Sequence, residues 1–208
     1  MSGMNFPYLL EAALMAVVLL FSIIVHEVAH GYVALLNGDP TARMLGRITL
    51  NPVPHIDMVG TILVPGLLLL SGSSFLIGWA KPVPVNPLNF RNYRWGEFAV
   101  SAAGPVSNLA LAAIFSILLR LGLENPGLTQ LAYYGVSINV TLALFNLIPI
   151  PPLDGSHILA LVLPRELARL YDHLQPVGFI LILILFYTGI LSAIIMPIYR
   201  QIAMIMLG

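Results

Sequence analysis

The sequence contains no cysteine and few charged residues. Only 9% of its 208 residues are Asp, Glu, Lys or Arg, against about 25% in soluble domains. Without cysteine, disulfides and thiolate metal sites are excluded, so a metal ion would have to bind His, Asp or Glu. Nine basic residues balance nine acidic ones, so the charge does not favour a nucleic-acid partner. The first 25 residues contain no Lys or Arg, which argues against a secretory signal peptide.

Apolar residues dominate what remains. They make up 59% of the chain, and the mean hydropathy is +0.93, which indicates an integral membrane protein. The length fits one domain, residues 1–208, with no soluble domain inserted. Four apolar runs are long enough to cross a bilayer as helices, so the fold class predicted is an all-α polytopic membrane protein. The predicted spans are 6–36, 98–119, 128–150 and 177–198.

Between the first two spans the sequence changes character. Residues 59–70 are apolar but number only twelve and contain Pro65-Gly66, so they predict a short helix or a re-entrant hairpin. "GRITL" (46–50) and "KPVPV" (81–85) have extended character and predict a small membrane-associated β element. Residues 165–175 predict an amphipathic helix at the membrane interface.

The first predicted span contains the motif H-E-x-x-H, as His26-Glu27-Val28-Ala29-His30. Residues four apart lie on one face of a helix, so both imidazoles can reach one metal ion, and the glutamate can reach a water on that metal. Such a motif also arises by chance, with each histidine satisfied in the core. However, one charged residue at the bilayer centre costs at least about 2.5–3.5 kcal/mol, which favours a shared metal.

A catalytic zinc site needs a third protein ligand. The candidates include His55, Asp57, Asp154 and His157. Asp154 stands out because it lies in "NLIPIPPLDG", a proline-rich break between apolar runs, and irregular backbone at membrane depth is tolerated where it is buried or lines a cavity. The alternative is an ordinary Asp-Gly turn, or the N-cap of a helix that starts near Ser156.

The membrane topology tests this choice. Asp154 can meet His26 and His30 only if the first and third spans point the same way, which requires that 59–70 does not cross the membrane, so we predict that this segment is re-entrant. The basic residues then divide seven to two, as the positive-inside rule expects for a site nearer the cytoplasmic face of the cell membrane. The seven are Arg43, Arg47, Lys81, Arg91, Arg94, Arg165 and Arg169, and the two are Arg120 and Arg200.

These motifs resemble the site-2 protease family, the membrane-embedded zinc metalloproteases of peptidase family M50. The resemblance rests on H-E-x-x-H within an apolar helix and on "NLIPIPPLDG" (146–155), and "AGPVSN" (103–108) and "GWAKPVPVNP" (78–87) are also similar to segments of compact bacterial members. Leu153 before Asp154 differs from the residue that some members have at this position of the motif, and we expect no PDZ or CBS domain.

The resemblance implies one Zn²⁺ per chain, bound by His26, His30 and Asp154, with Glu27 as general base. Asn146 matches a family asparagine near the substrate or oxyanion, although an amide that bonds helix to helix is an equal interpretation. Asn108 and Asn139 are interpreted as packing amides between helices. The remaining three histidines belong to no recognisable motif: His55, His157 and His173.

The function expected is therefore intramembrane hydrolysis of peptide bonds in or near the transmembrane segments of membrane protein substrates. An alternative is a non-proteolytic protein that keeps the metal as a structural clamp and binds membrane helices. Glu27 discriminates between them, since a structural site needs no acid or base beside it. A metal or proton transporter is a third alternative, but its polar residues would step across the whole membrane rather than gather at one depth.

Overall fold

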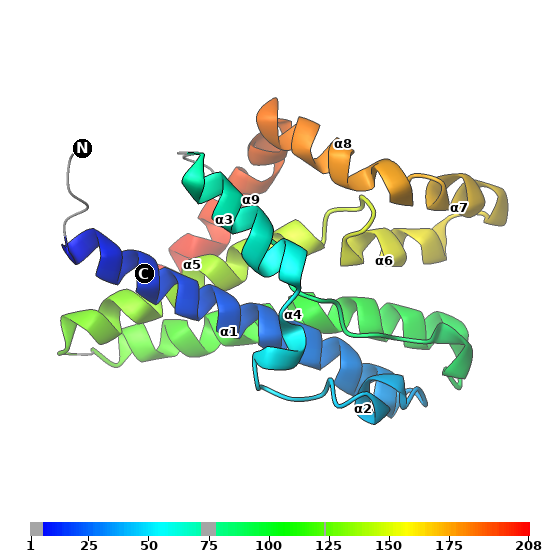
Figure 1. Cartoon of the computed structure of the whole chain (residues 1–208), viewed down its shortest axis with the longest axis horizontal. Coiled ribbons are helices and arrows are strands. Elements are labelled where there is room, and N and C mark those ends of the chain that lie inside the picture. The colour runs from blue at the N-terminus through cyan, green and yellow to red at the C-terminus, as the bar shows by residue number, and fades with distance from the viewer. Residues whose placement is uncertain (1–5, 72–77, 123) are drawn as a thin grey trace.

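The computed structural model describes residues 6–71, 78–122 and 124–208, and the regular structure of these residues is entirely helical (Figure 1). Four helices are long and apolar enough to cross a membrane, so the predicted all-α fold with four spans is confirmed: Leu10–Leu36 within α1 (Phe6–Leu36), α4 (Tyr93–Arg120), α5 (Pro126–Asn146) and α9 (Ile190–Leu207). The shorter elements are α2 (Thr41–Met44), η1 (Val53–His55), η2 (Met58–Leu63), α3 (Val64–Leu70), η3 (Pro87–Asn89), α6 (Asp154–Val162), α7 (Arg165–Asp172) and α8 (Gln175–Tyr187).

Helices α1, α4 and α5 lie side by side and form the body of the molecule (Figure 1). Tyr134 of α5 donates a hydrogen bond to Glu11 near the start of α1, and Asn139 donates one to Ser22 further along. Both helices therefore run in the same direction, and α4 returns between them. This is the arrangement that the predicted topology requires for α1 to meet the segment after α5.

The fourth span differs from the prediction. The apolar run 177–198 is broken, since α8 ends at Tyr187 and α9 begins at Ile190. Gly189 between them has a φ of +77° and donates its N–H to the carbonyl of Phe186. This left-handed conformation after a helix strongly favours glycine. The hydropathy runs unbroken through this point, and only the glycine marks the turn.

Residues 59–70 form a short helix, which was one of the two predicted alternatives. The π-helix η2 continues directly into α3, and Asp57 caps the start by accepting hydrogen bonds from the amides of Val59 (3.0 Å) and Gly60 (2.6 Å). Together Met58–Leu70 is 13 residues, or about 20 Å at 1.5 Å per residue. A helix of this length is shorter than the hydrocarbon core of about 30 Å.

The predicted β element is wrong, because the described residues contain no strand. In "KPVPV" every second residue is proline and has no N–H to donate to a sheet. Two of the three remaining donors are used elsewhere: Lys81 N–H goes to the His55 carbonyl (2.9 Å), and Val83 N–H goes to Glu27 Oε2 (2.7 Å). "GRITL" forms a turn, in which Gly46 has a φ of +63°.

A buried carboxylate fastens the extended segment to the end of α1. Asp39 is fully buried and accepts hydrogen bonds from the Thr41 hydroxyl, the Thr41 amide (3.1 Å), the Asn86 amide (2.7 Å) and Asn89 Nδ2 (2.8 Å). Burial alone would raise the pKa of Asp39, but these hydrogen bonds outweigh it and hold the pKa below its usual value. The stretch before α4 is thereby fixed alongside the helix that carries H-E-x-x-H.

Candidate metal centre

Helix α1 presents His26 and His30 on one face, and their Nε2 atoms lie 3.0 Å apart. Both residues are more than 90% buried. Each Nδ1 faces an oxygen on α4: Asn108 Oδ1 lies 2.6 Å from His26, and the carbonyl of Val100 lies 2.7 Å from His30. A carbonyl oxygen can only accept, so each Nδ1 carries the hydrogen and each Nε2 is left with its lone pair.

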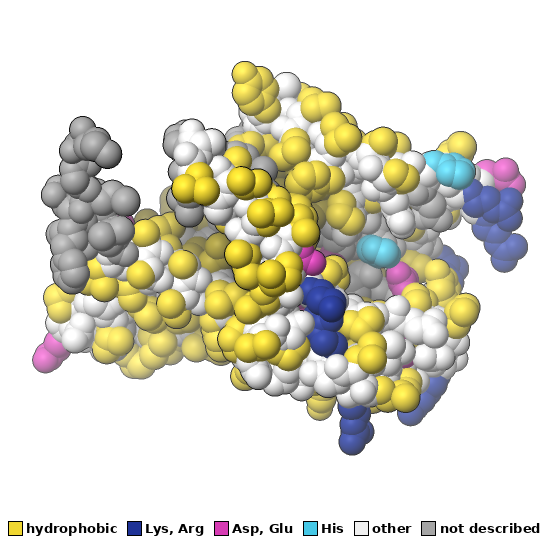
Figure 2. Space-filling model, in the orientation of Figure 1, with side chains coloured by type: hydrophobic (Ala, Val, Ile, Leu, Met, Phe, Trp, Pro, Cys, Tyr) yellow, Lys and Arg dark blue, Asp and Glu magenta, His cyan; other side chains and the backbone are white. Residues whose placement is uncertain are grey.

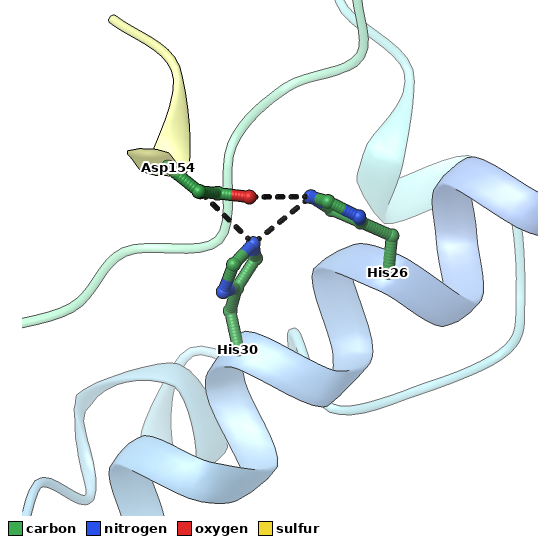
Figure 3. Close-up of side chains that lie close together, drawn as sticks. All are labelled: His26, His30 and Asp154. Atoms are coloured by element: carbon green, nitrogen blue, oxygen red, sulfur yellow. Dashed lines mark hydrogen bonds and ion pairs between the residues drawn. The ribbon is translucent and has the colours of Figure 1, made fainter. Parts of the chain in front are cut away.

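The third member of the group comes from the segment that follows α5. Asp154 is the first residue of α6, and its side chain points at both imidazoles (Figure 3). Asp154 Oδ2 lies 3.2 Å from His26 Nε2, and Oδ1 lies 3.4 Å from His30 Nε2. Gly155 allows the turn before it to fold tightly, since a Cβ there would lie 2.2 Å from the Leu147 carbonyl oxygen.

These three groups fit a zinc ion. Asp154 Oδ2 is buried and has no hydrogen-bond donor. Two imidazole lone pairs and a carboxyl oxygen therefore converge, an arrangement that a bound metal cation relieves. Ligands about 2.1 Å from a tetrahedral Zn²⁺ lie about 3.4 Å apart, close to the observed 3.0–3.4 Å.

Glycine makes the close approach of α4 possible. A Cβ at Gly104 would lie 2.4 Å from His26 Cε1 and 2.5 Å from the Nε2 atoms of both His26 and His30. Contacts below 3.0 Å are essentially never seen for real Cβ atoms. Gly104 therefore lets the backbone of α4 pass directly beside the two imidazoles, and any larger residue would displace them.

Glu27 faces the same space as the three ligands. Its Oε2 accepts a hydrogen bond from the Val83 amide (2.7 Å), which ties the extended segment to α1. Glu27 lines a cavity of about 590 Å³ together with both histidines and Asp154. The Val83 contact engages Oε2 and holds the carboxylate at this wall.

The cavity is mostly apolar. Asn146 lies on its wall and donates one amide hydrogen to the carbonyl of Leu142 (3.0 Å), four residues earlier on α5. Trp79 and Phe179 meet at its edge, with ring centroids 5.9 Å apart. Besides those named so far, the lining residues are Ile23, Gly78, Ala80, Pro82, Phe145, Pro152, Leu153 and Ile182.

The other candidates for a third ligand have different partners. His55 is buried, and its Nε2 bonds the carbonyl of Thr49 (2.9 Å). Asp57 caps η2, as described above. His157 pairs with Glu97 (3.0 Å), and this hydrogen bond raises the pKa of His157 because it outweighs the partial desolvation of the ring. Across the described ranges, His26, His30 and Asp154 are the group of His and acidic side chains spaced to hold a metal ion.

Two asparagines have a larger part than the sequence suggested. Asn108 and Asn139 were interpreted as packing amides, and they do bond helix to helix, but Asn108 also contacts a histidine of the cluster. The signal in the sequence was the spacing from Gly104 to Asn108. Four residues on α4 place the glycine and the amide on one helical face, toward α1.

The chain is similar in sequence to known zinc metalloproteases. Residues 122–185, which include Asp154, match the model of "Peptidase family M50". A Bacillus subtilis protein named "Putative zinc metalloprotease YwhC" is 41% identical over 92% of this chain and 85% of its own length. Rip2 of Mycolicibacterium smegmatis, named in the same way, is 29% identical over 83% of this chain and 66% of its own length. No solved structure matches the chain.

Proposed function

The chain belongs to peptidase family M50 and is a zinc metallopeptidase, and on this premise we propose that it hydrolyses peptide bonds in or near the transmembrane segments of other membrane proteins. The observation that carries the proposal is the position of the ligands. His26 and His30 lie inside Leu10–Leu36, an apolar helix long enough to span the membrane. A peptide bond that reaches this site must therefore come to it at membrane depth.

We propose that His26, His30 and Asp154 hold the zinc ion, one per chain, and that Glu27 is the general base. Bound zinc lowers the pKa of a water molecule toward 7 and polarises a carbonyl group. Glu27 takes the proton of the attacking water and passes it to the nitrogen of the leaving amine. The hydrogen bond from Val83 to Oε2 leaves Oε1 for this proton transfer.

Asn146 is proposed as the group that stabilises the oxyanion. It lies on the cavity wall with Glu27 and Asp154, and one of its two amide hydrogens is engaged by the Leu142 carbonyl. The second hydrogen can be donated to an oxygen that gains charge in the transition state. The apolar wall opposite favours an uncharged, unwound stretch of a substrate helix.

The proposed location is the cell membrane, with the site toward the cytoplasm and residues 1–208 acting as one catalytic domain. In Figure 2 the visible Lys and Arg side chains lie toward the right-hand end and the centre of the molecule, whereas hydrophobic side chains cover much of the remaining face. This separation supports the seven-to-two division of the basic residues.

The test compares the wild type, Glu27→Gln and the matched control Glu166→Gln in liposomes. Glu166 lies on α7 and is exposed, away from the cavity. Zinc per chain and cleavage of a panel of apolar transmembrane peptides are measured. Glu27→Gln should keep zinc and lose cleavage by about 10²–10⁴-fold, while Glu166→Gln retains both. If the wild type binds zinc but cuts no peptide, the structural clamp becomes the better explanation.

A further inference from the structure

A chain of buried amides leads away from the metal centre across three helices. It links His26 and Ser22 on α1 with Asn108 on α4 and Asn139 on α5. Ser22, Asn108 and Asn139 are fully buried. Polar groups this deep among apolar helices cost free energy unless each hydrogen bond has a defined donor and acceptor, so the direction of every bond can be worked out.

The bond directions follow from Asn139, which lies farthest from His26 in this series of hydrogen-bonded side chains. Its Nδ2 lies 2.8 Å from the Gly135 carbonyl and 2.8 Å from Ser22 Oγ. The carbonyl must accept, so the NH₂ group is on this side, and both of its hydrogens are used. Asn139 therefore turns its oxygen toward Asn108.

The orientation of Asn108 follows from that of Asn139. Asn108 Nδ2 lies 2.8 Å from Asn139 Oδ1 and 3.3 Å from the Ser22 carbonyl. If the Asn108 amide were flipped, its oxygen would face two other oxygens in a site closed to water. Asn108 must therefore present its own oxygen to His26 Nδ1, at 2.6 Å.

From this chain we propose that Asn108 is a positioning residue of the metal centre. It fixes the proton of His26 on Nδ1, so that the Nε2 lone pair points into the space shared with His30 and Asp154. His30 receives the same orientation from a backbone carbonyl, that of Val100, which no substitution removes. At His26 the acceptor is instead the side-chain oxygen of Asn108, and its orientation depends on Asn139 and Ser22. The metal-binding part of this inference rests on the proposed function.

Asn108→Leu tests the inference, because it keeps an amide-sized side chain but removes the acceptor. Without that acceptor, the proton of His26 should move to Nε2, which faces Asp154 at 3.2 Å. Zinc would then have to displace a proton, and the loss of such a supporting group typically weakens metal affinity by about 10–100-fold. Asn108→Asp keeps an oxygen toward Nδ1 and, with its other oxygen protonated toward Asn139 Oδ1, should recover part of the affinity.

Two readouts are used. The ¹⁵N spectrum of histidine in the metal-free chain at pH 8 shows which nitrogen of His26 carries the proton, with His26→Gln identifying its signals. Zinc affinity is measured by competition with a chelator. Ser116→Ala is the control, since it removes another buried hydrogen bond of α4, to the carbonyl of Met206 on α9.

The expected result is Nδ1–H in the wild type, Asn108→Asp and Ser116→Ala, but Nε2–H in Asn108→Leu, with weakened zinc binding in that variant. An Nε2–H signal in the wild type overturns the inference without any variant, even if Asn108→Leu does not fold. It is overturned too if Asn108→Leu binds zinc like the wild type, or if Ser116→Ala weakens binding equally. A wild type that shows Nδ1–H but binds no zinc would sink the proposed function and leave the proton assignment intact.

Discussion

The contact between α4 and the histidines offers a sharp test of the site, through the substitution Gly104→Ala. This change adds one methyl group and no charge. In a helix interior alanine is otherwise preferred over glycine by about 1 kcal/mol, so without the histidines the variant would be more stable. Any loss of metal binding therefore reports the contact between this methyl group and the two rings.

The magnitude follows from the distances. The new Cβ would lie 2.4 Å from His26 Cε1 and 2.5 Å from His30 Nε2, whereas ordinary contacts begin at 3.4 Å. The rings or the helix must therefore move by about 1 Å. Overpacking of this kind costs about 1–3 kcal/mol, which corresponds to a loss of roughly 5- to 150-fold in zinc affinity at 1.4 kcal/mol per factor of ten. A displacement of about 1 Å also lowers turnover by about 10²-fold.

The assay is zinc affinity by chelator competition, together with cleavage of a transmembrane peptide at saturating zinc. Gly66→Ala on α3 is the matched control, because a Cβ there meets nothing within 4 Å and its φ is not in the left-handed region. Gly66→Ala should leave both quantities within about twofold of the wild type. If Gly104→Ala behaves like Gly66→Ala, the close approach of α4 to the imidazoles is not what shapes the site.

Three further predictions concern one proposed ligand and two residues that hold the segments around the site. Asp154→Asn should weaken zinc binding by more than the roughly 10–100-fold typical of a supporting residue, in the same chelator assay, and an unchanged affinity would place the third ligand elsewhere. Asp39→Asn should lower stability by about 1–3 kcal/mol at pH 7, in thermal unfolding in detergent. Since the pKa of Asp39 lies below its usual 3.8, this contribution is present above pH 3.8 and is lost as the pH falls through the lowered value, so a difference that persisted at lower pH would contradict the assignment. Gly178→Ala should reduce both melting temperature and zinc affinity, because a Cβ there would lie 1.9 Å from the Pro151 carbonyl oxygen, and wild-type values would show that α8 does not hold the loop before Asp154.

Some features could be predicted because they are local. H-E-x-x-H on an apolar helix places two imidazoles on one face by helical geometry alone, and hydropathy predicted the right number of spans and located the first three. The break at Gly189 was missed because an apolar run shows no change in hydropathy where a helix turns. The β element was wrongly predicted because extended sequence character does not reveal whether backbone donors have a strand to pair with. In "KPVPV" two of these donors bond the side chain of Glu27 and the carbonyl of His55 instead.

The sequence by itself determined the chemistry available to this protein: no thiolate, few charges, and two imidazoles with a carboxylate inside an apolar helix. Only the tertiary structure decided how these groups are held. Gly104 and Asn108 act through contacts with histidines 74 to 82 positions away, and such contacts arise from helix packing rather than from local sequence pattern. The pairing of His26 with His30 can thus be predicted from spacing, whereas the orientation of the two rings depends on which backbone and amide oxygens the packed helices bring within hydrogen-bond distance.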